Sequence, residues 1–191
     1  MSEIIKPQQG IVFMKVGVHA REDLESIIAR KTKEIEEAGF ALWGYGGGTC
    51  HPVTMVQPFA KQHADKGEKI FLCMQEMKSN HFADPIRAEE YSIDRVEWKP
   101  VPKDIHVLGS RYALAIKALH REEFVLPLNK TKVAVGNSQG RPGNQYIGGR
   151  VDKACFQLTD NIMVPPEPSD TVIQINLVAE LCDPYAVFLR N

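Results

Sequence analysis

The residues from Ile11 to Tyr45, IVFMKVGVHAREDLESIIARKTKEIEEAGFALWGY, change hydrophobic period twice and so decide the fold. Residues 11–18 are a run of apolar and β-branched side chains, which is typical of a buried strand. In the next segment the leucine and isoleucines recur on one face of a 3.6-residue repeat. This spacing predicts a helix over about 21–38 that ends at Gly39. Because residues 40–45 return to a strand pattern, the N-terminal part is predicted to be a β-α-β unit.

Two further segments continue the alternation of helix and strand. After Pro52, apolar residues recur at helical spacing as far as Gly67, and the run from Lys69 to Gln75 is typical of a strand. Between residues 76 and 104 the pattern is polar and is interrupted by three X-Pro pairs. We therefore expect a long irregular loop there, a feature that is often functional.

The chain from residue 105 to 191 has mostly strand patterns. The expected strands are 110–119, 123–128, 132–136, 151–158, 171–181 and 185–189. Short polar breaks separate the first three, which suits an antiparallel meander. The sequence therefore predicts one α+β domain, in which the β-α-β part at about 11–75 is followed by a mainly antiparallel β-sheet or a small barrel.

The charge balance and the cysteine spacing limit the classes of partner. The chain has 23 basic and 24 acidic residues and a formal net charge of -1, so neither a nucleic-acid polymer nor an anionic membrane is an expected partner. The four cysteines form no CxxC pair, which argues against a zinc site or a redox dithiol. No apolar run approaches the ~20 residues of a membrane helix, and the start of the chain is too polar for a secretory signal. We expect a cytoplasmic protein.

An acidic segment in the predicted loop has the spacing of a metal site. Asp84, Glu97 and Lys99 imitate the acidic-x-Lys arrangement of metal-dependent nucleases. Pro100 follows at once and does not suit a central strand, so a solvated loop is the preferred interpretation. Neither a metal nor a cofactor is expected.

A first glycine-rich segment, WGYGGGTCH, follows the predicted β-α-β unit. Glycine lets a ligand approach the backbone closely, and aromatic rings can stack on a nucleobase. We expect the binding residues of this segment to be Trp43, Tyr45, Gly46, Gly47, Gly48, Thr49 and His51. The alternative is that the glycines only form a tight turn.

A second glycine-rich segment, NSQGRPGNQYIGGR, spans residues 137–150. Guanidinium groups match the fork geometry of phosphate and carboxylate. Ser138, Arg141, Tyr146 and Arg150 are therefore candidate ligand contacts, unless the arginines are merely solvated. Neither segment has a P-loop or dinucleotide-binding fingerprint.

Three residues are candidates for a catalytic role: His51, His19 and Cys50. Cys50 and His51 are adjacent on an extended chain and point to opposite faces, so they are not expected to form a nucleophile and base pair. His19 follows the first strand, where helix N-terminal amides could stabilise an anion. If the two strands of the β-α-β unit are parallel neighbours, His19 shares one sheet edge with the first glycine-rich segment. Otherwise it is a capping or surface histidine.

Together these features predict a cytoplasmic binding, sequestering or sensing protein for a small phosphate-bearing ligand, such as a nucleotide or a nucleotide-derived signal. One alternative is a hydrolase or transferase that acts on a nucleotide with histidine as general acid or base. Another is a protein-interaction component without a small ligand. A homo-oligomer is compatible with all three.

Overall fold

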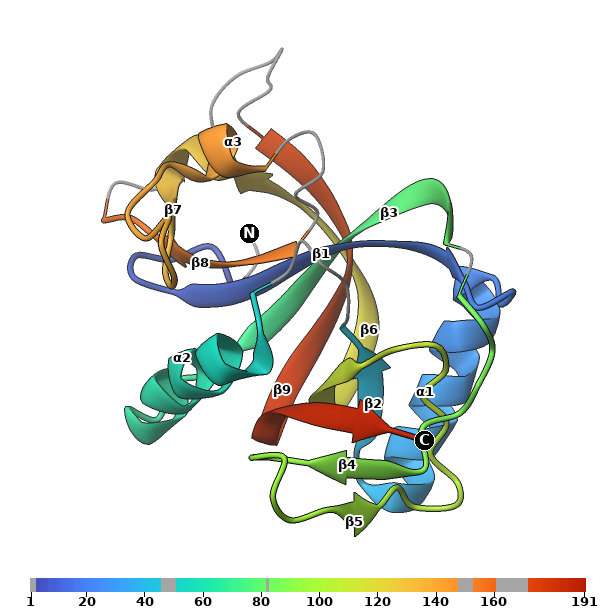
Figure 1. The fold of residues 1–191 in the computed structure, drawn as a ribbon. Coiled ribbons are helices and arrows are strands. Elements are labelled where there is room, and N and C mark those ends of the chain that lie inside the picture. Colours follow the sequence, from blue (N-terminus) through green and yellow to red (C-terminus); the bar gives the residue numbers. More distant parts are fainter. Residues whose placement is uncertain (1–2, 46–50, 82, 148–152, 161–171) are drawn as a thin grey trace.

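The computed structural model describes residues 3–45, 51–81, 83–147, 153–160 and 172–191. Figure 1 shows the arrangement of its helices and strands. In chain order these are β1 (Gly10–His19), α1 (Leu24–Ala38), β2 (Ala41–Gly44), α2 (Val53–Asp65), β3 (Phe71–His81), β4 (Glu90–Ser92), β5 (Lys99–Pro100), β6 (Tyr112–Pro127), the short 3₁₀ helix η1 (Leu128–Lys130), β7 (Thr131–Val133), α3 (Gly143–Tyr146), β8 (Lys153–Leu158) and β9 (Val172–Arg190).

The first helix starts later than its periodicity predicts because a turn precedes it. Ala20 and Arg21 have positive φ angles of 49° and 68°, which no helix contains. The Asp23 side chain then accepts a hydrogen bond from the Ser26 amide at 2.8 Å and caps the first turn. At the other end Gly39 takes a left-handed conformation, with φ of 84°, and ends the helix as predicted.

Within the described residues one sheet of nine strands forms the framework, and its main path runs β2-β6-β9-β3-β1-β8-β7. β1 and β3 are parallel, and the other neighbours are antiparallel. The predicted α+β class with a mainly antiparallel sheet is confirmed. The small-barrel alternative is wrong, because the end strands β2 and β7 of the described sheet do not pair with each other and the sheet stays open.

The two strands of the β-α-β unit are not neighbours. β6, β9 and β3 lie between β2 and β1 in the sheet. The condition that would have placed His19 beside the first glycine-rich segment through parallel pairing is therefore not met. β2 instead pairs antiparallel with the first part of β6.

The two longest strands replace pairs of shorter predicted ones. β6 covers all but the outer ends of the predicted strands at 110–119 and 123–128 and joins them, with a register irregularity between Arg121 and Phe124 where the polar residues lie. β9 likewise joins the predicted strands at 171–181 and 185–189. The predicted meander is wrong, because β6 pairs with β2 and β9 whereas β7 pairs with β8. The predicted loop at 76–104 also contains the end of β3 and the short strands β4 and β5.

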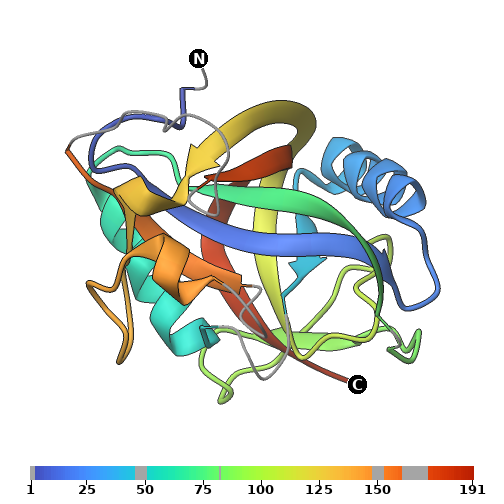
Figure 2. The ribbon, with the colours of Figure 1, turned by 90° about the horizontal axis from the view of Figure 1, so that it is seen from above.

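Side chains of alternate residues in β1 enter two different cores, as expected for a strand buried on both faces. Val12, Met14 and Val16 join the cluster that α1 and α2 cover, whereas Ile11 and Phe13 join the cluster beneath α3. Figures 1 and 2 show α2 near the start of β1 and α1 near its end. No helix in the described part of the chain has the length and apolar character of a membrane-spanning segment.

Candidate functional site

His51 lies where the first glycine-rich segment meets α2, and the fold buries it so that 7% of the residue is exposed. Its Nδ1 accepts a hydrogen bond of 3.0 Å from the backbone amide of Cys155. Its Nε2 lies 3.1 Å from the Tyr146 hydroxyl oxygen, and the two rings stack with centroids 5.8 Å apart. One histidine thus joins α2, α3 and β8.

The protonation state of His51 follows from these two partners. A backbone amide can only donate, so Nδ1 must carry its lone pair and no hydrogen. The neutral ring then carries its hydrogen on Nε2 and donates it to the Tyr146 oxygen. Burial lowers the pKa of His51, which favours the same neutral form.

His51 also ends the pairing between β7 and β8. The register pairs Val133 with Phe156, so the next opposed residues are Ala134 and Cys155. The Ala134 amide does donate to the Cys155 carbonyl oxygen at 2.9 Å, but the Cys155 amide donates to His51 instead. An imidazole nitrogen therefore takes the acceptor position at the end of the ladder.

Tyr146 is half-buried at the end of α3, and its ring packs edge-on against Phe156. Burial raises the pKa of its hydroxyl, the Cys155 thiol acts in the same direction, and the positive charge of Arg141 acts in the opposite one. The phenol is therefore protonated at neutral pH. Because its oxygen accepts from His51, its own hydrogen is available for a further acceptor.

Arg141 and Ser138 lie on the turn that leads into α3. Arg141 is exposed, and its amide donates to the Ser138 carbonyl oxygen at 3.0 Å while its own carbonyl oxygen accepts from the Val133 amide at 2.9 Å. These bonds fix the backbone of the turn against β7. The guanidinium is left at the surface, and its positive charge acts on the Tyr146 hydroxyl.

The described ends of the two glycine-rich segments meet in space. Besides the contact between His51 and Tyr146, a Cβ atom added to Gly136 would lie 3.3 Å from the sulfur of Met55 and 3.9 Å from Cδ2 of His51. The small residue at position 136 lets the second segment approach the start of α2 closely. Of the predicted site residues, His51 and Tyr146 are in direct contact, and Ser138 and Arg141 lie on the turn that leads into the helix of Tyr146.

Trp43 and Tyr45 lie in the core cluster under α1 and α2, where 4% and 1% of these residues are exposed. In this structure neither ring offers an open face for stacking on a base. Several predicted residues lie outside the described part of the chain: Gly46, Gly47, Gly48, Thr49, Cys50 and Arg150.

His19 lies at the end of β1, where its Nε2 is 3.0 Å from the carbonyl oxygen of Leu108. The same loop reaches β2, because a Cβ atom on Gly44 would lie 2.5 Å from the hydroxyl oxygen of Ser110. His19 is thus connected to β2 through residues 108–110 and not through strand pairing. The described contacts do not bring it to His51 or Tyr146.

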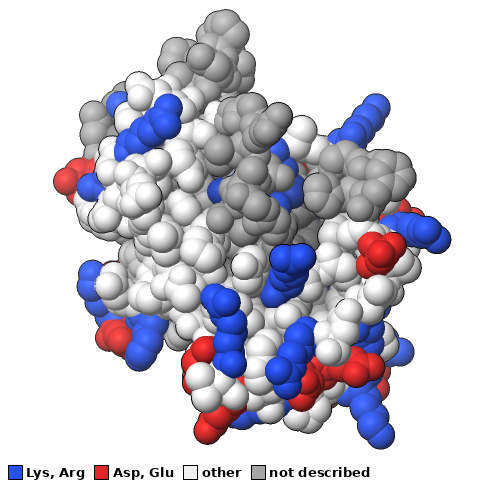
Figure 3. Space-filling view, viewed as in Figure 1, with Lys and Arg blue, Asp and Glu red and all other residues white. Residues whose placement is uncertain are grey.

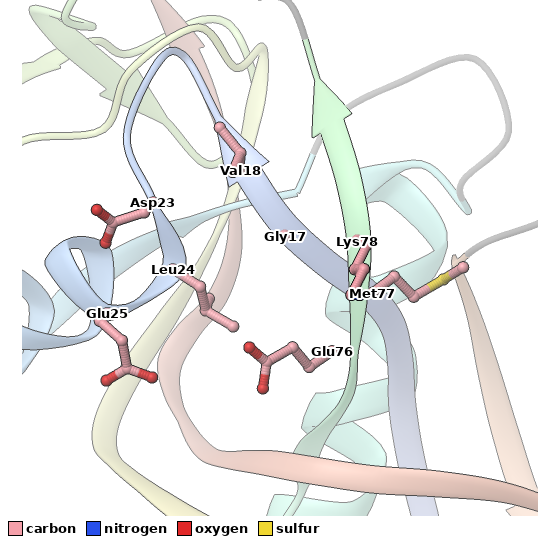
Figure 4. A pocket seen from close by; sticks show the side chains of 8 residues that line it. All are labelled: Gly17, Val18, Asp23, Leu24, Glu25, Glu76, Met77 and Lys78. Carbon is pink, nitrogen blue, oxygen red and sulfur yellow. The ribbon is translucent and has the colours of Figure 1, made fainter.

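A separate pocket of about 590 Å³ lies between the start of α1 and strands β1 and β3. Figure 4 shows the Glu76 carboxylate pointing toward Leu24 and Glu25. Both glutamates already bind one cation, since Arg121 pairs with Glu76 at 2.8 Å and also with Glu25. The carboxylate of Asp23 caps the helix. The three carboxylates of this pocket therefore already have partners within the protein.

The surface and the cysteines add little to the site. On the face in Figure 3, basic side chains are spread apart and mix with acidic ones along the lower margin. Cys73 and Cys182 are free thiols. Among the described residues, no group of three or more histidine, cysteine, aspartate or glutamate side chains is placed to hold a metal ion.

Sequence reasoning missed the parts of the site that come from backbone and from small residues. The Cys155 amide and Gly136 carry no distinctive side chain, so no motif marks them. A partial signal existed in Gly136, which directly precedes the second glycine-rich segment. A scan against protein-family models and searches of curated proteins and of solved structures found no match to this chain.

Proposed function

We propose that this protein binds a small phosphate-bearing ligand, such as a nucleotide or a nucleotide-derived signal, where the two glycine-rich segments meet. The observation that carries the proposal is the contact between His51 and Tyr146. It joins two segments that both have the backbone freedom and the polar side chains typical of ligand-binding loops. The cysteine spacing supports a cytoplasmic setting for this binding.

The chemistry of the described residues suits an anion. Tyr146 has a hydroxyl hydrogen to donate, and Arg141 supplies a permanent positive charge and planar donors. Hydrogen bonds between such donors and phosphate oxygens are among the stronger ones in proteins. Because both groups are held by the same turn and helix, a ligand could bind them together with little rearrangement.

Binding without turnover agrees better with the state of His51 than catalysis does. A general base must offer a lone pair to the reacting group. In His51 the Nδ1 lone pair accepts from Cys155, and Nε2 carries a hydrogen directed at Tyr146. We therefore expect the ligand to be recovered unchanged after incubation, which chromatography of the released compound checks.

Replacing Arg141 and Arg150 together by alanine tests the site. Wild-type protein should gain thermal stability with a member of a panel of nucleoside mono-, di- and triphosphates and inorganic phosphate, because a ligand that binds the folded state stabilises it. The double variant should lose most of this shift. Lys33→Ala is the control, since Lys33 is an exposed cation on α1. An unchanged shift in the double variant would remove both arginines from the site.

A further inference from the structure

His51 and Tyr146 form a chain of hydrogen bonds with a defined direction. The chain begins at the Cys155 amide, which donates to Nδ1, and continues from the Nε2 hydrogen to the Tyr146 oxygen. Each donor in this chain has one possible acceptor, so the direction cannot reverse while the ring is neutral. The last hydrogen, on the Tyr146 hydroxyl, must then point away from His51.

From this direction we infer that His51 is a positioning residue, which holds Tyr146 as a hydrogen-bond donor and so makes the proposed site select ligand oxygens that only accept. The inference rests on the proposed function and assigns His51 a role in place of the direct ligand contact that the sequence predicts. Oxygens of a phosphate dianion fulfil the requirement, because they carry lone pairs and no hydrogen. A neutral hydroxyl that must donate finds the main acceptor site of Tyr146 already occupied.

Protonation of His51 in acid should break this series of hydrogen bonds. A second proton on the ring goes to Nδ1, which faces the Cys155 amide at 3.0 Å, and two donors cannot bond to each other. The described groups that contact the ring are the hydroxyl and ring of Tyr146 from α3 and the backbone amide of Cys155 from β8. The nearest titratable groups on these elements and the preceding turn are the Cys155 thiol and the Arg141 guanidinium, whose charges act on Tyr146. In the described part of the chain, none of these groups is a carboxylate that would stabilise the added charge.

The predicted change of ligand affinity with pH is opposite in sign to that of a site where histidine contacts the anion directly. A histidine that contacts an anion directly binds it more tightly in acid, because the ring gains a positive charge. Here acid protonates Nδ1, which then no longer accepts the hydrogen bond that orients the ring. The imidazole is then no longer held in place to donate to the Tyr146 hydroxyl oxygen. Affinity for a phosphate compound should therefore fall as the pH is lowered from about pH 8 to about pH 5.

Two conservative variants test the roles of the two imidazole nitrogens separately. The amide nitrogen in His51→Gln can replace the Nε2 donor toward Tyr146, whereas the amide oxygen in His51→Asn can replace only the Nδ1 acceptor toward Cys155. Affinity for the tightest-binding phosphate compound of the panel would be measured by calorimetry. We expect Tyr146→Phe and His51→Asn each to weaken binding about tenfold, their combination to weaken it no further, and His51→Gln to stay within about threefold of wild type.

The pH profile and the tautomer are the decisive readouts. The acid-induced loss should be larger in wild type than in His51→Gln, where only the part caused by protonation of the phosphate itself (second pKa about 6) should remain. Nitrogen NMR of the ring in the ligand-free wild-type protein should show the Nε2-H tautomer, a result that does not depend on how the variants fold. The inference is overturned if the ring is the Nδ1-H tautomer, if acid strengthens binding, or if His51→Asn binds like wild type.

Failure of the inference and failure of the proposed function give different results. If no phosphate compound binds wild type, the proposed function is wrong, and this inference falls with it. If a compound binds and the arginine variant loses it, while Tyr146→Phe and His51→Asn do not, the function stands and the positioning role is wrong.

Discussion

At the scale of single residues, Lys31 places an amine in the interior, with 2% of the residue exposed. Its Nζ lies 3.1 Å from a Glu34 carboxylate oxygen and 2.5 Å from the His106 carbonyl oxygen. These bonds tie α1 to the loop before β6. Burial nevertheless lowers the pKa of Lys31 to about 8, because the desolvation of the amine outweighs the attraction of Glu34.

The pH dependence of stability should reveal this buried amine. The ordinary pKa of lysine is 10.5 and the folded value is about 8, so between these two pH values the unfolded chain binds more protons than the folded one. The free energy of unfolding should therefore rise with pH in that window, by about 3 kcal/mol at most.

Urea unfolding of wild type, Lys31→Met and the exposed-residue control Lys33→Met checks this expectation. The rise should be present in wild type and in Lys33→Met and missing in Lys31→Met. The slopes are compared and not the absolute stabilities, because Glu34 loses a partner in Lys31→Met and keeps Arg30 and the His106 amide. Equal slopes in all three proteins would contradict a depressed lysine pKa.

At the scale of elements, the contact between β1 and α2 depends on the absence of a side chain at Gly10. A Cβ atom there would lie 2.3 Å from Nε2 of His63, which is closer than non-bonded atoms approach. His63 cannot easily move, because its Nδ1 is 2.6 Å from a Glu68 carboxylate oxygen and its ring packs edge-on against Phe59. Helix and strand therefore share one closely fitted contact.

Gly10→Ala should lower the free energy of unfolding by about 1–3 kcal/mol in the wild-type background, as overpacking in a core does. In a His63→Ala background the same change should cost little, because the space beside the strand is then open. Chemical denaturation of the four proteins of this double-mutant cycle measures the coupling. An equal cost in both backgrounds would show that His63 is not the obstacle.

Polar residues within β6 caused the strand boundaries to be predicted wrongly. His120, Arg121 and Glu122 interrupt the apolar pattern, so two strands are predicted where one exists. Their side chains point to solvent and to ion pairs, with Arg121 bonded to Glu76. The strand continues because the backbones of His120 and Arg121 still pair with β9 whatever their side chains are, and pairing resumes at Phe124 after the register irregularity.

At the scale of the whole molecule, the long antiparallel pair of β6 and β9 holds the sheet together. β9 pairs with β3 near Leu177 and Ala179, and β6 pairs with β2 near Ala113 and Ile116. These positions are buried, whereas the β4-β5 hairpin at the C-terminal end of β9 has exposed residues such as Val96. The most stable part of the molecule should therefore be this central pair.

Native-state hydrogen exchange should be slower in the central β6-β9 pair than in the β4-β5 hairpin. Amides in the centre of β6 and β9 should exchange only through global unfolding, and those of the β4-β5 hairpin through low-energy local opening. Mass spectrometry of peptides or NMR of single amides measures both classes. Stronger protection in the hairpin than in β9 would contradict the central role of the pair.

The sequence by itself determined most local elements. The 3.6-residue repeat and Gly39 predicted α1 and its end, and the continuous apolar run at 11–18 predicted a buried strand. These features depend on neighbours a few residues away, so local hydrophobic periodicity reports them. The glycine-rich composition likewise marked the two segments that meet at the candidate site.

Only the tertiary structure decided which elements are neighbours and what His51 does. His51 is 95 residues from Tyr146 and 104 residues from Cys155 in the chain, and one of its two contacts is a backbone amide. Strand order likewise separates β1 from β2, although they are consecutive around α1. Periodicity records whether a residue is buried. The identity of its partner depends on how the whole chain packs, because every residue other than proline carries the same backbone donor and acceptor.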